Sequence, residues 1–215
     1  MLPWPQGPHL GRRIARLLVG LVLFGIGLAF MVLADLGLAP WEVLHQGITF
    51  RTGILIGTVG ILTGLAVLIF WIPIGERIGL GTILNVLVIG VVIDVSLWIL
   101  PNEINAAWLQ WTALLGGLLS VGVGSGLYIG AGMGSGPRDG LMTGMGRKGF
   151  SMGLTRTVVE ISVLVGGWLL GGTVGIGTVF FAFGVGPSVA YFLRRLAVED
   201  PQPVGATVTN LDSGP

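Results

Sequence analysis

Long stretches without a charged residue constrain this chain more than any other feature. Only 10 % of its 215 residues are charged, whereas 53 % are hydrophobic and 39 are glycine. A soluble domain carries roughly 25 % charged residues, so these charges are too few to cover a surface in water. The composition excludes a single soluble domain and places the chain in a lipid bilayer. The uncharged intervals are residues 17–34, 52–75, 78–93, 104–137 and 161–193.

Several classes of partner and cofactor are not expected. The net charge is only +1 and no long basic run occurs, which argues against nucleic acid as a partner. The chain has no cysteine, so disulfides, haem thiolates and iron–sulfur clusters are excluded. No sequence motif for a cofactor or a metal ion is found, and we predict neither.

The uncharged intervals predict an all-α membrane protein. A helix needs about 20 mostly apolar residues to cross the hydrocarbon core. On this basis we expect six transmembrane helices, with bounds near 13–35, 54–74, 79–100, 107–131, 153–171 and 174–194.

Two shorter segments, 37–51 and 134–148, separate some of these spans. Each opens with glycine and reaches a proline three residues later, at Pro40 and Pro137, which favours a helix that begins at the proline. A helix of about 11 residues is only roughly 17 Å long, too short to cross alone. The alternative is that both segments cross, which gives eight spans, four in each half.

The basic residues predict the orientation. With six spans, ten of the eleven Lys and Arg lie on the side of the N-terminus, and only Arg51 lies on the other. The positive-inside rule then makes both termini cytoplasmic. With eight spans the division is nine to two, so charge does not decide between the two topologies.

The sequence repeats itself at an offset of about 97 residues. Gly37, Pro40 and Glu42 align with Gly134, Pro137 and Asp139, and residues 78–82 (Ile-Gly-Leu-Gly-Thr) align with 174–178 (Val-Gly-Ile-Gly-Thr). We predict two pseudo-symmetric halves, inverted if each has three spans and parallel if each has four. The expected divisions are an N-terminal tail (1–11), two halves (12–105 and 106–196) and a disordered tail (197–215).

The short segments are the first candidate site. Short, Gly/Pro-interrupted segments at matching positions of inverted repeats mark the midplane site of many secondary transporters. In the second segment, glycines such as Gly136, a helix N-terminus, Ser135 and Arg138 offer donors to an anion. The alternative is a tight turn in which Asp139 serves the first helical turn.

Ionisable residues inside the spans are the second candidate set. Asp94 is the strongest candidate for a proton- or cation-coupled carboxylate, and contact with Arg156, Arg138 or a backbone amide is the competing explanation. Asn85, nine residues earlier, is expected to line the same cavity. Arg156 and Glu160 are four residues apart and can also form a purely structural ion pair. Glu42, with His45 and Gln46 beside it, makes the first short helix polar.

An intramembrane enzyme is not expected. Rhomboid-type serine proteases need Gly-x-Ser-Gly, which is missing, and no histidine lies in the C-terminal half. The His-Glu-x-x-His pattern of a metalloprotease is missing as well.

Four motifs give the chain a resemblance to a known family. The chain resembles the bacterial YczE/YyaS/YitT-type integral membrane proteins, most of all the short YczE-like members, over about residues 12–196. The resemblance implies a multi-pass protein of the bacterial plasma membrane and no established substrate. The motifs are Gly132-Met-Gly-Ser-Gly-Pro-Arg-Asp-Gly-Leu-Met142, Thr155-Arg-Thr-Val-Val-Glu-Ile161, the stretch 167–178 and Leu84-Asn-Val-Leu-Val-Ile-Gly-Val-Val-Ile-Asp94.

Our hypothesis from the sequence is a small secondary transporter or permease for a small solute, with an anion favoured by the loop at 134–140. The alternative is a membrane scaffold or accessory protein that does not transport. The glycine-rich helix faces would permit a homodimer without requiring one.

Overall fold

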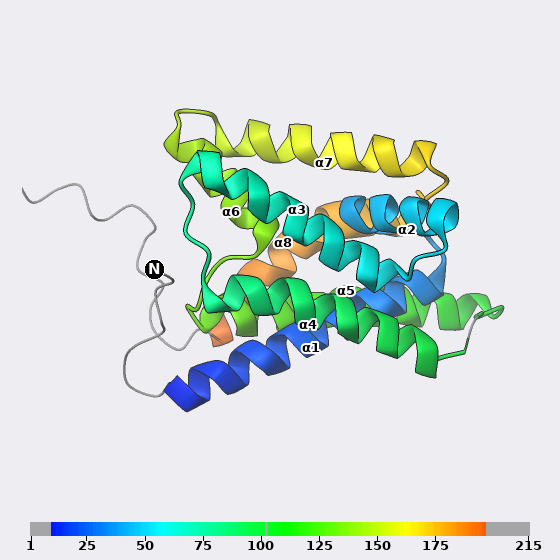
Figure 1. The fold of residues 1–215 in the computed structure, drawn as a ribbon. Helices are drawn as coiled ribbons and strands as arrows, with labels where there is room; N and C mark the ends of the chain where they lie inside the picture. Colours follow the sequence, from blue (N-terminus) through cyan, green and yellow to red (C-terminus); the bar gives the residue numbers. More distant parts are fainter. Residues whose placement is uncertain (1–9, 102, 197–215) are drawn as a thin grey trace, which may run out of the picture.

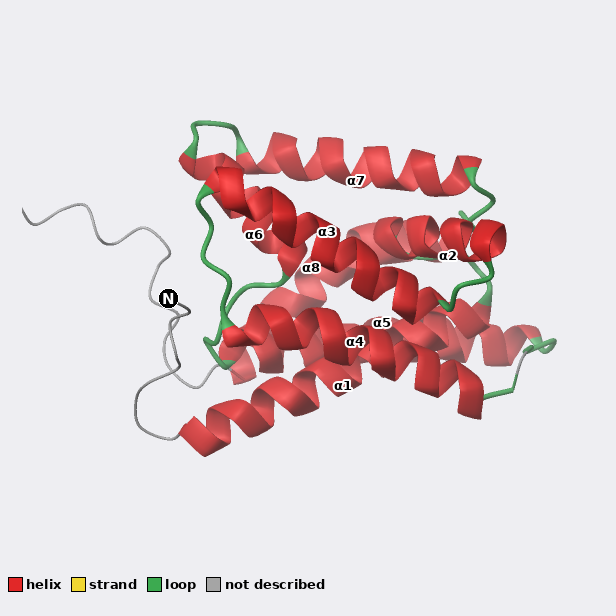
Figure 2. Ribbon diagram, viewed as in Figure 1, coloured by secondary structure: helices red, strands yellow, loops and turns green. Residues whose placement is uncertain are grey.

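The computed structural model describes residues 10–101 and 103–196, and these residues form helices and loops without a strand. Six helices are long and apolar enough to cross a membrane, whereas α2 and α6 are short. The prediction of an all-α membrane protein with six spans and two short helices is confirmed. The predicted disordered tail at 197–215 lies outside the described residues. The helices (Figures 1 and 2) are α1 (Leu10–Ala34), α2 (Pro40–Thr52), α3 (Ile56–Ile74), α4 (Leu80–Ile99), α5 (Ala107–Gly130), α6 (Pro137–Arg147), α7 (Met152–Leu169) and α8 (Ile176–Leu196).

Both short helices begin at the predicted prolines, Pro40 and Pro137. Proline fits the first helical position because the N–H that it lacks would have no intrahelical partner there. Gly37 and Gly134, three residues earlier, have φ angles of 109° and 128°. Such angles favour glycine, and they let the chain turn sharply between a long helix and the short helix that follows it.

The long helices α1 and α5 form the antiparallel pair with the most extensive contact in the bundle. Gly27 of α1 faces Gly117 of α5, and Gly20 faces Gly124, so the two backbones come close together. A Cβ atom on Gly117 would lie 2.6 Å from the carbonyl oxygen of Gly27, and one on Gly27 would lie 2.6 Å from that of Gly117. Small residues allow such close packing in lipid, where helix association depends on van der Waals contact.

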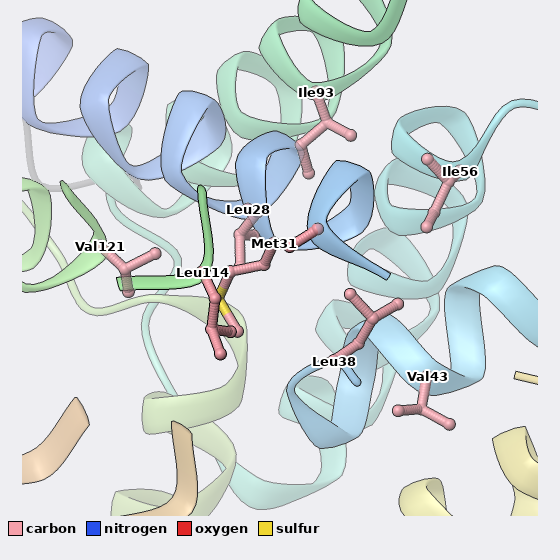
Figure 3. Packing of buried hydrophobic residues seen from close by; sticks show 9 residues of the cluster. Leu28, Met31, Leu38, Val43, Ile56, Ile93, Leu114 and Val121 are labelled. Atoms are coloured by element: carbon pink, nitrogen blue, oxygen red, sulfur yellow. The ribbon is translucent and has the colours of Figure 1, made fainter. Parts of the chain in front are cut away.

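A buried apolar cluster joins α1 and α5 to the neighbouring helices. Leu28 and Met31 of α1 pack with Leu114 and Val121 of α5, as Figure 3 shows. Val43 of the short helix α2 belongs to the same cluster, as do residues of α3 and α4. The short helix is therefore packed into the bundle and does not lie on its surface.

The helices pack in two similar arrangements, one that includes α1 and one that includes α5. Helix α4 packs on α1 as α8 packs on α5; α7 packs on α2 as α3 packs on α6. In Figure 1, α7 lies along one edge of the molecule and α1 along the opposite edge. Each arrangement contains one short helix held between long ones.

The short helices end at opposite faces of the bundle. Arg51, in the last turn of α2, donates to the carbonyl oxygen of Leu170 in the α7–α8 connection (3.2 Å). Lys148, just after α6, donates to the carbonyl oxygen of Pro73 near the end of α3 (2.8 Å). With six alternating spans, the end of α3 and the end of α7 lie on opposite sides of the membrane. The C-terminal ends of α2 and α6 therefore do so too.

One pattern of backbone hydrogen bonds occurs twice. The N–H of Gly81, at the start of α4, donates to the carbonyl oxygen of Met133, before α6 (2.9 Å). The N–H of Gly177, at the start of α8, donates in the same way to Leu36, before α2 (2.7 Å). Each bond fastens the loop before a short helix to the first turn of a long helix.

The glycine contact between α1 and α5 gives a direct test of the fold. Gly117→Ala should lower the free energy of unfolding by about 1–3 kcal/mol, because its methyl group would push the two backbones apart. Gly116→Ala, on the same helix, is the matched control, since nothing lies within 4 Å of a Cβ atom there. Thermal unfolding in detergent measures both variants, and an equal loss in the two would contradict the packing.

Candidate functional site

A cavity of about 430 Å³ lies where the short helices begin, and residues from all eight helices line it. Its lining includes residues 40–42, the first turn of α2, and residues 137–139, the first turn of α6. The first-turn N–H groups of a helix have no intrahelical partner, and that end carries partial positive charge. Two such ends therefore converge on one cavity.

An ion pair joins the two first turns. The Arg138 guanidinium donates to Glu42 Oε1 at 2.7 Å, and it also lies over the ring of Trp41, 4.9 Å from the ring centroid. Glu42 is only 2 % exposed. The N-terminal ends of α2 and α6 are therefore in direct contact through side chains.

Two polar atoms beside this ion pair are buried without a hydrogen-bond partner among the described residues. They are Glu42 Oε2 and Trp41 Nε1. A buried polar atom left unpaired costs about 1–3 kcal/mol. Buried polar atoms usually have a hydrogen-bond partner, so these two atoms of cavity-lining residues can accept a hydrogen bond from, or donate one to, a molecule in the cavity.

Further polar side chains line the cavity near this ion pair. His45 shares a hydrogen bond of 2.8 Å with the Thr63 hydroxyl of α3. The Tyr128 hydroxyl of α5 donates to Asp139 Oδ2 over a longer 3.4 Å. Ser125, one turn before Tyr128, also lines the cavity and is buried. Arg156 Nε of α7 donates to Glu160 Oε1 at 2.9 Å, as the predicted ion pair of residues four apart.

Most of the residues that the sequence singled out come together here. Asp94 and Ser135 do not line the cavity. The carbonyl oxygen of Ser135 instead accepts a hydrogen bond from the Thr82 hydroxyl at 2.8 Å. The predicted residues that do line it are Glu42, Asn85, Gly136, Arg138, Asp139, Arg156 and Glu160.

Asp94 binds the beginning of α3. Its Oδ1 accepts from the N–H of Gly57 at 2.6 Å, and its Oδ2 accepts from the Thr58 hydroxyl at 2.8 Å. Of the two explanations offered for Asp94, these contacts match the second, in which its carboxylate binds a backbone amide. The expectation that Asn85 and Asp94 share a cavity wall is wrong, because nine residues make two and a half helical turns and place them on opposite faces.

Sequence reasoning missed four cavity residues whose side chains carry a hydrogen-bonding group: Trp41, Thr63, Ser125 and Tyr128. One signal was available for Trp41. It aligns with Arg138 at the offset of the repeat, and the two side chains stack on each other. The hydroxyl residues lie in apolar spans, where their sequence neighbours do not reveal which face is buried.

Comparison with known proteins places the chain in a family. A family of unknown function, DUF6198, matches residues 11–194. The chain belongs to this family. Two relatives are an uncharacterized protein of Haemophilus influenzae, 41 % identical over 86 % of this chain and 85 % of the relative, and the uncharacterized membrane protein YczE of Bacillus subtilis, 30 % identical over 82 % and 83 %. The resemblance to YczE-like proteins is confirmed. No solved structure gives a significant match to this DUF6198 member.

The contacts of Asp94 predict different effects for two substitutions. Asp94→Ala should lower the free energy of unfolding by about 1–3 kcal/mol, because it leaves the first turn of α3 without its acceptor. Asp94→Asn keeps an oxygen for the N–H of Gly57 and should cost less. Thermal unfolding of the purified variants measures the difference, and a loss in Asp94→Asn as large as in Asp94→Ala would contradict the capping role.

Proposed function

We propose that this multi-pass membrane protein is a small secondary transporter that holds its solute in the cavity between α2 and α6. One observation carries the proposal: two helices too short to span the membrane meet at their N-terminal ends around a polar cavity, and their C-terminal ends reach opposite faces. Discontinuous helices of this kind form the central site of many secondary transporters. A dry structural bundle has no need for paired charges at this position, because burying them is costly.

The proposal includes an inverted duplication, and contacts made twice support it. A shift of about 97 residues carries the contact between Gly20 and Gly124 onto that between Gly117 and Gly27. The same shift, less one residue, relates the hydrogen-bond donors Gly81 and Gly177. Three spans in each half would make the halves antiparallel, which is the inverted arrangement in which many secondary transporters alternate access by rocking one repeat against the other.

The charges of the cavity argue against a simple anion as the solute. Arg138 is paired with Glu42, and Arg156 is paired with Glu160, so both guanidinium groups already have carboxylate partners. Asp139 adds a third carboxylate. The expected preference for an anion depended on Arg138 as a donor to the solute, and the ion pair with Glu42 removes that support.

A scaffold or accessory protein is the second candidate function. Helix α7 packs mainly on the short helices α2 and α6, and its outward side chains, such as Val158 and Ile161, are exposed. Such a face would suit a partner helix as well as lipid. Transport and scaffolding differ in whether water reaches the cavity.

Two cysteine variants test the topology, and the natural absence of cysteine makes the labelling clean. We expect Arg51→Cys to react with an impermeant maleimide in intact cells, and Lys148→Cys to react only in inverted vesicles. The reason is that α2 and α6 end at opposite faces, with the N-terminus cytoplasmic by the positive-inside rule. Labelling of Arg51→Cys from the cytoplasmic side alone would indicate eight spans and overturn the inverted arrangement.

A third cysteine tests access to the cavity. Ser125→Cys should react with a small impermeant thiosulfonate in both right-side-out and inverted vesicles, because a transporter exposes its site to each side in turn. Val121→Cys, one turn away on α5 and packed in the apolar cluster, is the control that should react in neither. Reaction of Ser125→Cys from one side only, or from neither, would refute transport and favour the scaffold.

A further inference from the structure

The two arrangements of helices differ at one place. Helices α3 and α4 are tightly packed: a Cβ atom on Gly90 would lie 2.5 Å from the carbonyl oxygen of Gly57, and Asp94 binds the start of α3. Helices α7 and α8, which take the matching place in the second arrangement, do not form a packed pair; α7 packs on α2 and α6, and α8 packs on α5. The bundle is closed between α3 and α4 and open between α7 and α8.

The cavity reaches this opening. Arg156 and Glu160 of α7 line the cavity, and their side chains are 54 % and 34 % exposed. Gly186 and Ala190 of α8 also line it and are exposed. Most of the polar lining of α2 and α5 is buried, as Glu42, Ser125 and Tyr128 show. Three of the four exposed lining residues, Arg156, Gly186 and Ala190, belong to α7 and α8, and the fourth is Asp139 of α6.

The opening lies between apolar helix surfaces. Val158 and Ile161 of α7 and Phe183 of α8 are exposed and face away from the packed bundle. Apolar side chains on the outside of membrane-spanning helices contact the hydrocarbon of the bilayer. A molecule that passes between α7 and α8 would come from lipid.

The lining itself is divided into a polar wall and an apolar wall. The polar wall comes from the short helices and α7, with Glu42, Arg138, Asp139, Arg156 and Glu160. The apolar wall comes from α1, α8 and part of α4, with Phe24, Leu28, Ile89, Phe181, Val185 and Val189. Asn85 of α4 lies on the polar side, near Gly136. A cavity with one wall of each kind is complementary to an amphiphile and leaves one wall poorly matched to a purely hydrophilic solute.

We infer that the solute is a membrane-borne amphiphile with a zwitterionic head, which enters sideways between α7 and α8. Its head group lies against the ion pair of Glu42 and Arg138, and part of its chain lies along Val185 and Val189. The polar wall combines three carboxylates, two guanidinium groups and two positive helix ends, so a head with both signs of charge matches it better than one with a single sign. That the amphiphile is transported rests on the proposed function. Its entry from lipid can be measured separately.

Three bimane-labelled single-cysteine variants in vesicles test the opening. Val189→Cys reports on the cavity, Phe183→Cys on the lipid-facing side of the same helix, and Val121→Cys on the packed core. Nitroxide-labelled phosphatidylcholine should quench bimane at positions 189 and 183 to a similar extent and spare position 121, whereas aqueous iodide should quench position 189, through the water-reachable cavity, and spare positions 183 and 121. Quenching at 189 by iodide alone, or by neither quencher, would overturn lateral entry.

Single-chain nitroxide amphiphiles then test the head group. The amphiphiles enter the bilayer in different amounts, so quenching at position 189 is divided by quenching at the lipid-facing position 183. This ratio should be about threefold higher for a phosphocholine head than for a sulfate or a trimethylammonium head, because a single unmatched charge lacks its counterpart on the polar wall. Equal ratios, or a higher ratio for either singly charged head, would overturn the assignment.

The two proposals fail in different ways. Lipid quenching at 189 together with one-sided labelling of Ser125→Cys would leave an amphiphile site without transport. Labelling of Ser125→Cys from both sides with no lipid quenching at 189 would leave a transporter whose solute comes from water.

Discussion

The fold depends on supplying hydrogen bonds to backbone groups where a helix is interrupted inside a membrane protein. The hydrocarbon core offers no water, so a helix end at that depth is tolerated only where protein groups or a cavity satisfy it. Here the loop before each short helix donates or accepts through the other half of the chain: Met133 accepts from Gly81, and Leu36 accepts from Gly177. The Gly-x-Gly-Thr motif of each half thus binds the loop before the short helix of the other half. Neither half could satisfy its own interruption.

Contacts between the two halves also occur at the cavity, but there the two halves contribute different contacts. Trp41 and Arg138 align in the repeat and stack on each other, so the contact lies where the two halves meet. Glu42 and Asp139 also align, yet Glu42 binds Arg138 while Asp139 lies beside Tyr128. The backbone hydrogen bonds of Gly81 and Gly177 recur at matching positions, whereas the contacts of the charged side chains do not. The asymmetry of the site therefore comes from its side chains.

Much of the fold could be predicted from the sequence, because the signals are local. Proline and glycine at fixed spacing gave the start of both short helices, and uncharged length gave the six spans. The partners of the charges could not be predicted, since Glu42 and Arg138 are 96 residues apart and apolar spans show no periodicity that reveals the inner face. Asn85 and Asp94 are a different case: helical geometry alone places them on opposite faces, so only one of them could line the site.

Asp94 of α4 helps to hold α3 against α4. Its carboxylate fastens the first turn of α3 to α4 through Gly57 and Thr58. The residue that aligns with it at the offset of the Gly-x-Gly-Thr motif is Ala190, which lines the cavity at its opening and has no side-chain acceptor for the start of α7. Asp94 and the close contact of Gly57 with Gly90 thus both hold α3 against α4. At the same offset, the positions in α8 that match Asp94 and Gly90 are Ala190 and Gly186, and nothing lies within 4 Å of a Cβ atom placed on Gly186. Both contacts that hold α3 against α4 are therefore missing between α7 and α8.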